Sequence, residues 1–158
     1  MGYETILTDA RNSVWQAIDN FADLAGQIKT KFKFNDEGSC MKDAEPSFSD
    51  LTAVALLPMG VTPKWYTNEK QKWPYSLRIV TWTADWRLQT SEVLMMRLAK
   101  AIQSATPENS TKPYTADYQP LIGPNVGIQI TIIKKENPIK VVKASLDIVL
   151  RCNFQPRP

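Results

Sequence analysis

The fold is decided near the end of the chain, by the stretch IQITIIKKENPIKVVKASLDIVLRCNF at residues 128–154. Apolar side chains alternate with polar ones in both of its halves, at Ile128, Ile130 and Ile132 and then at Val142, Ala144, Leu146, Ile148, Leu150, Cys152 and Phe154. Because successive side chains of a strand point to opposite faces, both halves are predicted to be strands. Glu136-Asn137-Pro138 is predicted to be the turn of the resulting hairpin. A slip of one residue would turn the whole apolar row to water, so its register is well specified.

Three shorter strands are predicted upstream of this hairpin. Residues 28–34 alternate Ile28, Thr30, Phe32 and Phe34 with three lysines, which indicates an edge strand with a lysine-rich outer face. Leu51 to Leu57 are predicted to form a short apolar strand that ends at Pro58-Met59-Gly60. Tyr75 to Thr83 are apolar on both faces, which is typical of a central strand, and place Trp82 in the core.

Two helices are predicted from apolar spacings of three and four residues. The first covers residues 5–25 and stops at Gly26. The second covers residues 89–104, with Thr90 or Ser91 as its cap and Glu92 in its first turn. Its predicted buried stripe consists of Val93, Leu94, Leu98, Ala101 and Ile102.

The remaining segments are predicted to be loops, at residues 35–50, 61–72 and 105–125. The element order is then α-β-β-β-α-β-β. We predict a two-layer α+β fold in which two helices cover one face of a mixed or antiparallel sheet of four to five strands. A length of 158 residues fits a single domain spanning residues 1–158.

The composition argues against catalysis. The chain has no histidine, which removes Ser-His-Asp and Cys-His arrangements and HExxH zinc sites, and its 6 glycines leave little material for a phosphate-binding loop. Cys152 is predicted to be a buried structural thiol, and Cys40 an incidental loop cysteine. A carboxylate cluster in the 35–50 loop lacks the spacing of a calcium loop and is interpreted as a solvated acidic loop; its members are Asp36, Glu37, Asp43, Glu45 and Asp50. We therefore predict no enzyme, no metal site and no cofactor.

The charge is mild overall but uneven along the chain. The net charge of +3, from 19 basic and 16 acidic residues, is weaker than nucleic-acid binders usually carry, so nucleic acid is not the expected partner. Residues 1–27 are mainly acidic and residues 134–158 mainly basic. Opposed ends of this kind suit head-to-tail association. No signal peptide and no apolar stretch of 18 residues is found, which favours a cytoplasmic setting without a membrane.

Two groups of side chains are candidates for partner contact. Trp65, Tyr66 and Trp73 lie in or beside a loop, where they can stack on sugars or single-stranded nucleic acid, anchor a protein interface, or pack locally. The second group is basic and consists of Lys29, Lys31 and Lys33 on the predicted edge strand and Lys143 and Arg151 on the outward face of the last strand. Lys29, Lys31 and Lys33 can contact phosphate or form a solvated face of the edge strand.

Several segments together resemble a known family. They are the N-terminal helix, DLTAVALLP at residues 50–58, YSLRIVTWT at 75–83 running into EVLMMRLAKAI at 92–102, and the terminal hairpin. In this arrangement the chain resembles the small neck and tail-completion proteins of tailed bacteriophages, which include tail terminators and tail-to-head joining proteins. The connection at 105–125 and the aromatic loop at 61–75 depart from the family pattern.

The resemblance implies a non-enzymatic assembly protein that forms rings, typically hexameric, at the end of the tail tube or at the portal connector. It further implies protein partners (further copies of the chain, and tail or neck proteins) and a virion-associated location. A different hypothesis stays open beside it: a small binding module that uses Trp65, Tyr66 and Trp73 to hold a glycan or single-stranded nucleic acid.

Overall fold

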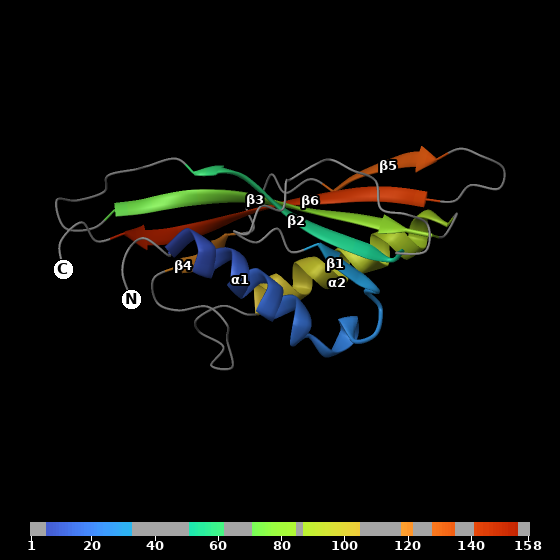
Figure 1. Cartoon of the computed structure of the whole chain (residues 1–158), viewed down its shortest axis with the longest axis horizontal. Coiled ribbons are helices and arrows are strands. Elements are labelled where there is room, and N and C mark those ends of the chain that lie inside the picture. The colour runs from blue at the N-terminus through green and yellow to red at the C-terminus, as the bar shows by residue number, and fades with distance from the viewer. Residues whose placement is uncertain are drawn as a thin grey trace.

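The computed structural model describes residues 6–32, 51–61, 71–84, 87–104, 118–121, 128–134 and 141–154. The helical elements are α1 (Ile6–Asp19), the short 3-10 helix η2 (Ala22–Leu24) and α2 (Leu88–Ser104). The strands are β1 (Thr30–Phe32), β2 (Ala53–Val61), β3 (Gln71–Thr83), β4 (Tyr118–Leu121), β5 (Ile128–Lys134) and β6 (Val141–Phe154). Figure 1 shows α1 and α2 together on one side of the sheet, so the predicted two-layer α+β class is confirmed.

The strands form one mixed sheet in the order β1-β2-β3-β6-β4, and β5 also pairs with β6. Among the described strands, only β1 and β2 run parallel; every other pair is antiparallel. The long strands β3 and β6 pair from Gln71 opposite Phe154 to Thr83 opposite Val142 and form the centre of the sheet. The predicted hairpin is confirmed in β5 and β6, where Ile130 lies opposite Ala144.

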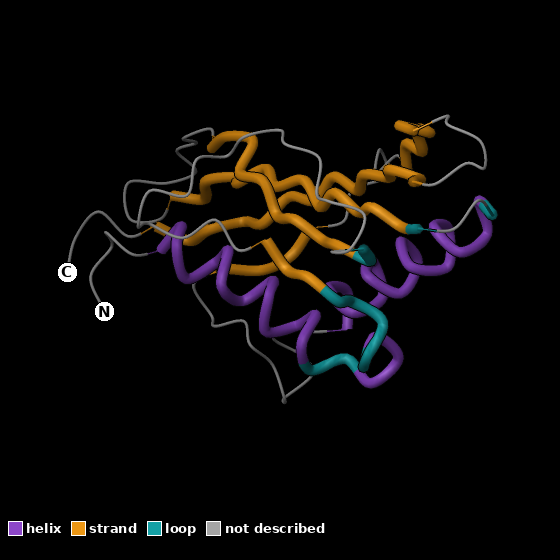
Figure 2. The backbone as a smooth tube through the Cα atoms, turned by 45° about the vertical axis from the view of Figure 1, so that its right-hand side comes forward, coloured by secondary structure: helices purple, strands orange, loops and turns teal. Residues whose placement is uncertain are grey.

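The main core lies between the sheet and the two helices (Figure 2). Its largest fully buried side chains are Val14 and Ile18 from α1, Met95, Leu98 and Ile102 from α2, and Val54, Leu77, Ile79, Leu146, Ile148 and Leu150 from the sheet. On β6 these residues are even-numbered, as the alternation at residues 142–150 predicts. Burial of this one row fixes the register of the strand against the helices.

A smaller apolar cluster lies on the opposite face of the sheet, which we call the outer sheet face. It consists of Ala53, Ala55, Val80 and Trp82, with Phe32, Leu51, Leu57 and Val141 packed around it. Trp82 is 5% exposed, which confirms its predicted place in a core. Its ring stands edge-on to Phe32, with centroids 6.3 Å apart.

The strand count and several strand boundaries differ from the prediction; β3, for example, begins at Gln71 and not at Tyr75. β4 occupies residues within 105–125, which the sequence predicts to be a connection, so the sheet has six strands instead of four or five. β2 does not end at Pro58-Met59-Gly60 but passes through it to Val61, because a bulge between Pro58 and Gly60 absorbs the extra residue. β1 begins at Thr30, two residues after the predicted start at Ile28, and residues 33 and 34 of the predicted strand lie outside the described residues.

The helix boundaries differ as well. α1 ends at Asp19 and not at residue 25, since the amide of Phe21 bonds the carbonyl of Ile18, an i→i−3 contact that tightens the last turn. α2 begins at Leu88, which places Thr90 and Ser91 inside its first turn and leaves no acidic residue there. Both the predicted caps and the predicted place of Glu92 are therefore wrong.

One side chain of the predicted α2 stripe faces the other way. Leu94, Leu98, Ala101 and Ile102 are buried as predicted, but Val93 is 39% exposed. The buried face is centred instead on Ser91, Met95 and Leu98, each 0% exposed. In the segments that the structure describes, no helix combines the length and the apolar character that crossing a bilayer requires.

Candidate functional site

The structure separates the basic residues proposed for partner contact instead of gathering them. Lys31 lies opposite Val54, a core residue beneath the helices, so its side chain is on the helix side of the sheet. Its ammonium pairs there with Asp19 at the end of α1. Lys29 is exposed just before β1, where its amide bonds the carbonyl of Thr52. Lys143, in contrast, lies opposite Trp82 on the outer sheet face.

The other candidates are placed only in part. Trp73 lies in β3 opposite Cys152, and Arg151 lies in β6 opposite Pro74 and Gln119. Their positions in the strands follow from this register. Lys33, Trp65 and Tyr66 fall outside the described residues, as do Cys40 and the five carboxylates of residues 36–50. The binding-module hypothesis, which rests on the loop aromatics, therefore stays a prediction.

Three cross-strand pairs of β3 and β6 form a row on the outer sheet face: Arg78 with Asp147, Val80 with Ser145, and Trp82 with Lys143. The Arg78 guanidinium donates two hydrogen bonds to the Asp147 carboxylate, from Nε to Oδ1 at 2.7 Å and from Nη2 to Oδ2 at 3.2 Å. The Lys143 ammonium lies 5.9 Å from the centre of the Trp82 ring, within range of a cation–π contact. The charges of Arg78 and Asp147 are thus matched within this partly exposed row, whereas the Trp82 ring that Lys143 contacts carries no charge.

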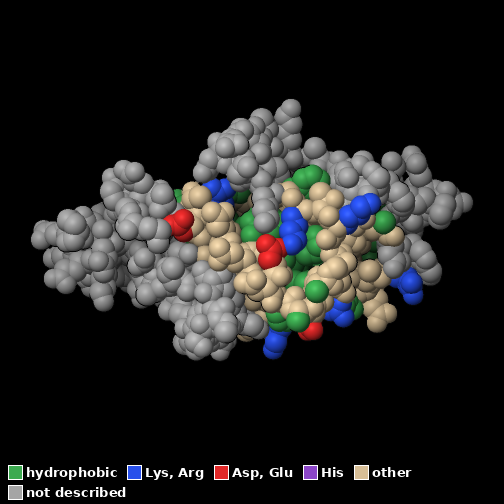
Figure 3. All heavy atoms as spheres, turned by 60° about the horizontal axis from the view of Figure 1, so that its bottom comes forward, with side chains coloured by type: hydrophobic (Ala, Val, Ile, Leu, Met, Phe, Trp, Pro, Cys, Tyr) green, Lys and Arg blue, Asp and Glu red, His purple; other side chains and the backbone are tan. Residues whose placement is uncertain are grey.

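The helix side of the molecule exposes apolar side chains beside charges (Figure 3). Within the described residues, four large hydrophobic side chains are exposed: Met59, at 50%, and three on α2, namely Leu88 at 45%, Val93 at 39% and Met96 at 59%. We call Val93 and Met96, with Glu92, Arg97 and Lys100, the α2 outer face; Leu88, in phase with the buried Met95 seven residues later, is the first residue of the helix. Two large apolar side chains exposed three residues apart make this face a candidate contact surface.

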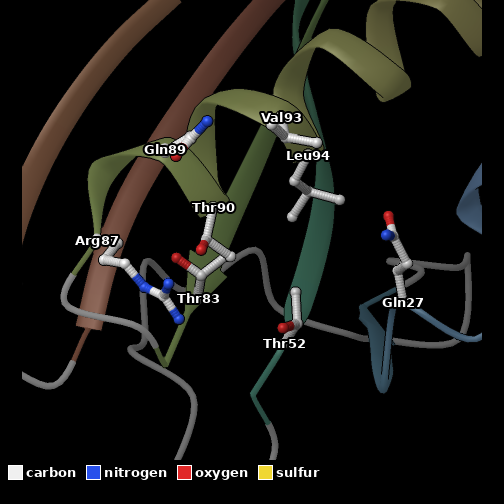
Figure 4. Close-up of a pocket in the computed structure, with 8 residues that line it drawn as sticks. All are labelled: Gln27, Thr52, Thr83, Arg87, Gln89, Thr90, Val93 and Leu94. Carbon is white, nitrogen blue, oxygen red and sulfur yellow. The ribbon is translucent and has the colours of Figure 1, made fainter.

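A pocket of about 380 Å³ opens beside the start of α2. Four segments of the chain line it: Gln27 after η2, Thr52 before β2, Thr83 at the end of β3, and Arg87, Gln89, Thr90, Val93 and Leu94 at the beginning of α2 (Figure 4). Val93 belongs both to this pocket and to the α2 outer face, so the two features form one continuous surface.

The pocket offers hydrogen bonds, one guanidinium and an apolar wall. The Thr83 hydroxyl donates to the carbonyl of Val142 at 3.4 Å, which holds this lining residue against β6. None of the eight lining residues carries a carboxylate, a thiol or an imidazole, the groups that most often transfer protons. The arrangement therefore suits the binding of a polar or anionic group better than acid–base chemistry. The described residues also hold no cluster of three potential metal ligands.

Sequence reasoning missed both the α2 outer face and the pocket. Val93 falls in the predicted core stripe because it is apolar and one position from Leu94, and the polar Ser91 falls outside it. The pocket combines four segments that are far apart in the sequence, and no local motif marks it.

No protein-family model and no curated protein matches the chain. Among solved structures, it is similar to a chain of the "Virion of native gene transfer agent (GTA) particle" with a TM-score of 0.61. The two are 13% identical, and the similarity covers 97% of this chain and 100% of the other. At this identity the comparison establishes a shared fold: the two-layer arrangement described above also occurs, over its full length, in a component of a virion.

Proposed function

We propose that this chain is a structural subunit of a virion of the tailed-phage kind, acting as a neck or tail-completion protein of the terminator type. In this role it binds further copies of itself in a ring and contacts tail or neck proteins, and it works without catalysis and without a cofactor. The location that follows is the assembled particle, and the cytoplasm before assembly.

The observation that carries the proposal is the end-to-end similarity to a chain of the gene transfer agent virion, which leaves no large segment of either chain unmatched. The resemblance of residues 50–58, 75–83 and 92–102 to phage neck proteins supports it independently, because that resemblance rests on sequence pattern alone. The exposed apolar side chains of α2 support it further, since a subunit of an assembly needs surfaces that are covered only by its partners.

The proposal is tested by removing the gene from the genome that carries it and imaging the particles that form. A terminator-type subunit predicts heads and tails that accumulate unjoined, or tails of irregular length, together with a loss of infectious or transducing titre. Supplying the wild-type chain from a plasmid should restore both. Intact, joined and active particles formed without the chain would contradict the proposal.

A further inference from the structure

The α2 outer face has the composition of a protein interface. Val93 and Met96 expose 39% and 59% of their surface on the side of the helix away from the core. The core side of the same helix is completed by Ser91, Leu94, Met95, Leu98, Ala101 and Ile102, all buried. Since these six residues already fill the inner side of the helix, the exposed side chains of Val93 and Met96 lie outside the core. They are available to a partner.

The charge on this face favours an acidic partner. Two basic residues, Arg97 and Lys100, stand against one acidic residue, Glu92, and Arg87 precedes the helix. Within the described part of the chain, no ion pair or hydrogen bond of the Arg97, Lys100 or Glu92 side chain is formed. The excess positive charge of Arg97 and Lys100 is therefore not neutralised by described neighbours.

An acidic surface of the required kind exists on the same chain. The outer side of α1 and η2 exposes Asn12, Gln16, Asp19, Asn20 and Asp23, which we call the α1–η2 outer face. Asp19 pairs with Lys31, whereas Asp23 forms no ion pair or hydrogen bond through its side chain with the described residues. Because Lys31 already matches the charge of Asp19, Asp23 is the carboxylate that gives the α1–η2 outer face a negative charge complementary to the α2 outer face.

We propose that the α2 outer face of one copy of this chain packs against the α1–η2 outer face of the next copy, head to tail. The inference rests on the proposed function, because it specifies how the subunits of that assembly meet. Two different surfaces of one chain form such a contact, so it repeats from copy to copy and closes into a ring when the rotation permits. Met96 and Val93 supply the apolar centre, while Lys100 and Asp23 supply the charges that orient the approach.

The apolar part of the interface is tested with Met96→Glu, using Met59→Glu as the matched control. Both methionines are about equally exposed, at 59% and 50%, and Met59 lies on β2 outside the proposed contact. Self-association of the wild type is measured by light scattering and sedimentation over a concentration series. Met96→Glu should weaken it by about tenfold or more, as loss of an interface centre does, and Met59→Glu should not change it. Equal behaviour of the two variants would overturn the inference.

The charged part is tested by mixing two variants that carry opposite defects, Lys100→Asp and Asp23→Lys. Each alone places like charges across the contact and should associate several-fold more weakly than the wild type, with the defect shrinking at high salt. In an equimolar mixture, a contact between unlike variants joins either the two unchanged residues, Lys100 and Asp23, or the two substituted positions. In the second case the charges are reversed but still opposite. Association should then return towards the wild-type level. A mixture as weak as its components would overturn the proposed pairing of surfaces.

Failure of this inference can be told apart from failure of the proposed function. A wild-type chain that stays monomeric over the whole series, or that associates through other surfaces, overturns the head-to-tail contact. The proposed function is judged separately, by whether particles lacking the chain stay unjoined or irregular. Circular dichroism of each variant confirms that it is folded before association is compared.

Discussion

Individual polar side chains at the centre of the fold differ in whether their hydrogen-bonding groups are satisfied. The Thr81 hydroxyl, which is buried, lies 3.4 Å from the Met95 sulfur and 3.5 Å from the Ala144 carbonyl. The Ser13 hydroxyl donates to the Asp9 carbonyl at 2.8 Å. The Ser91 hydroxyl oxygen and the Trp82 indole nitrogen are buried without a partner among the described residues. An unpaired buried polar group costs about 1–3 kcal/mol, so these two positions lower the stability of the fold.

Ser91→Ala should therefore stabilise the protein. The substitution removes a hydroxyl that is 0% exposed and unpaired, and alanine is also the better helix former at this position of α2. We expect the free energy of unfolding to rise by about 1 kcal/mol, measured by urea denaturation.

Ser13→Ala is the matched control, because Ser13 is similarly buried at 3% but its hydroxyl is paired. It should leave stability unchanged or lower it slightly. A loss of stability in Ser91→Ala larger than that in Ser13→Ala would contradict the account.

At the scale of elements, β2 shows how the edge of the sheet is protected. The Thr52 carbonyl accepts hydrogen bonds from the amides of Lys29 and Thr30, so it points towards β1. Every second residue of the strand points its backbone groups the same way, which places those of Val54, Leu56 and Pro58 on the edge that faces β1. β1 covers only Ala53–Ala55. Beyond it, Pro58 has no N–H to offer, and the bulge at Met59 breaks the regular ladder. Both devices discourage another strand from pairing here.

The bulge depends on Gly60, which has a φ of +141° within β2. A Cβ at Gly60 or at Gly26, whose φ is +76°, would meet no atom within 4 Å. The cost of an alanine is then purely conformational. Gly60→Ala should cost about 2 kcal/mol, because its φ region is nearly restricted to glycine, and Gly26→Ala about 1 kcal/mol, because other residues visit the left-handed region. Thermal unfolding of the two variants tests the ranking; a costlier Gly26→Ala would contradict it.

The two faces of α2 should respond differently to truncation. Leu98 is 0% exposed and lies in the main core, so Leu98→Ala should lower the free energy of unfolding by about 2–5 kcal/mol. Met96 lies on the α2 outer face and is 59% exposed, so Met96→Ala should change stability by about 0.5 kcal/mol or less. Denaturant unfolding compares the two, and a large loss in Met96→Ala would show that the outer face is part of the core.

Periodic patterns predict the elements whose faces differ sharply in polarity, and fail where they do not. The hairpin at residues 128–154 and both helices have a strong period of two or of three to four, whereas the central strand is recognised because it is apolar on both faces. β4 escapes prediction because its four residues, Tyr118–Leu121, include a proline and are too few to show a period. The continuation of β2 through Pro58-Met59-Gly60 is not predicted, because the residues that form turns also form bulges.

At the scale of the whole molecule, the sheet order decides what the candidate residues can do together. Lys31 and Lys143 look alike in the sequence, but they lie on opposite faces of the sheet, with β2 and β3 between their strands. The contact surfaces that we propose lie on the helix side, where α1, η2 and α2 present complementary charges. Sequence reasoning could predict the acidic start of the chain, but not that α2 exposes Val93 and Met96. That exposure depends on tertiary packing.

The most direct test of the central claim is the protein content of particles purified from the organism that carries this chain. Particles are banded on a density gradient, and the chain is quantified by mass spectrometry against the major capsid and tail proteins. A structural subunit predicts that the chain sediments with intact particles in a small, constant number of copies per particle. A chain found only in the soluble fraction, and absent from active particles, would contradict the account.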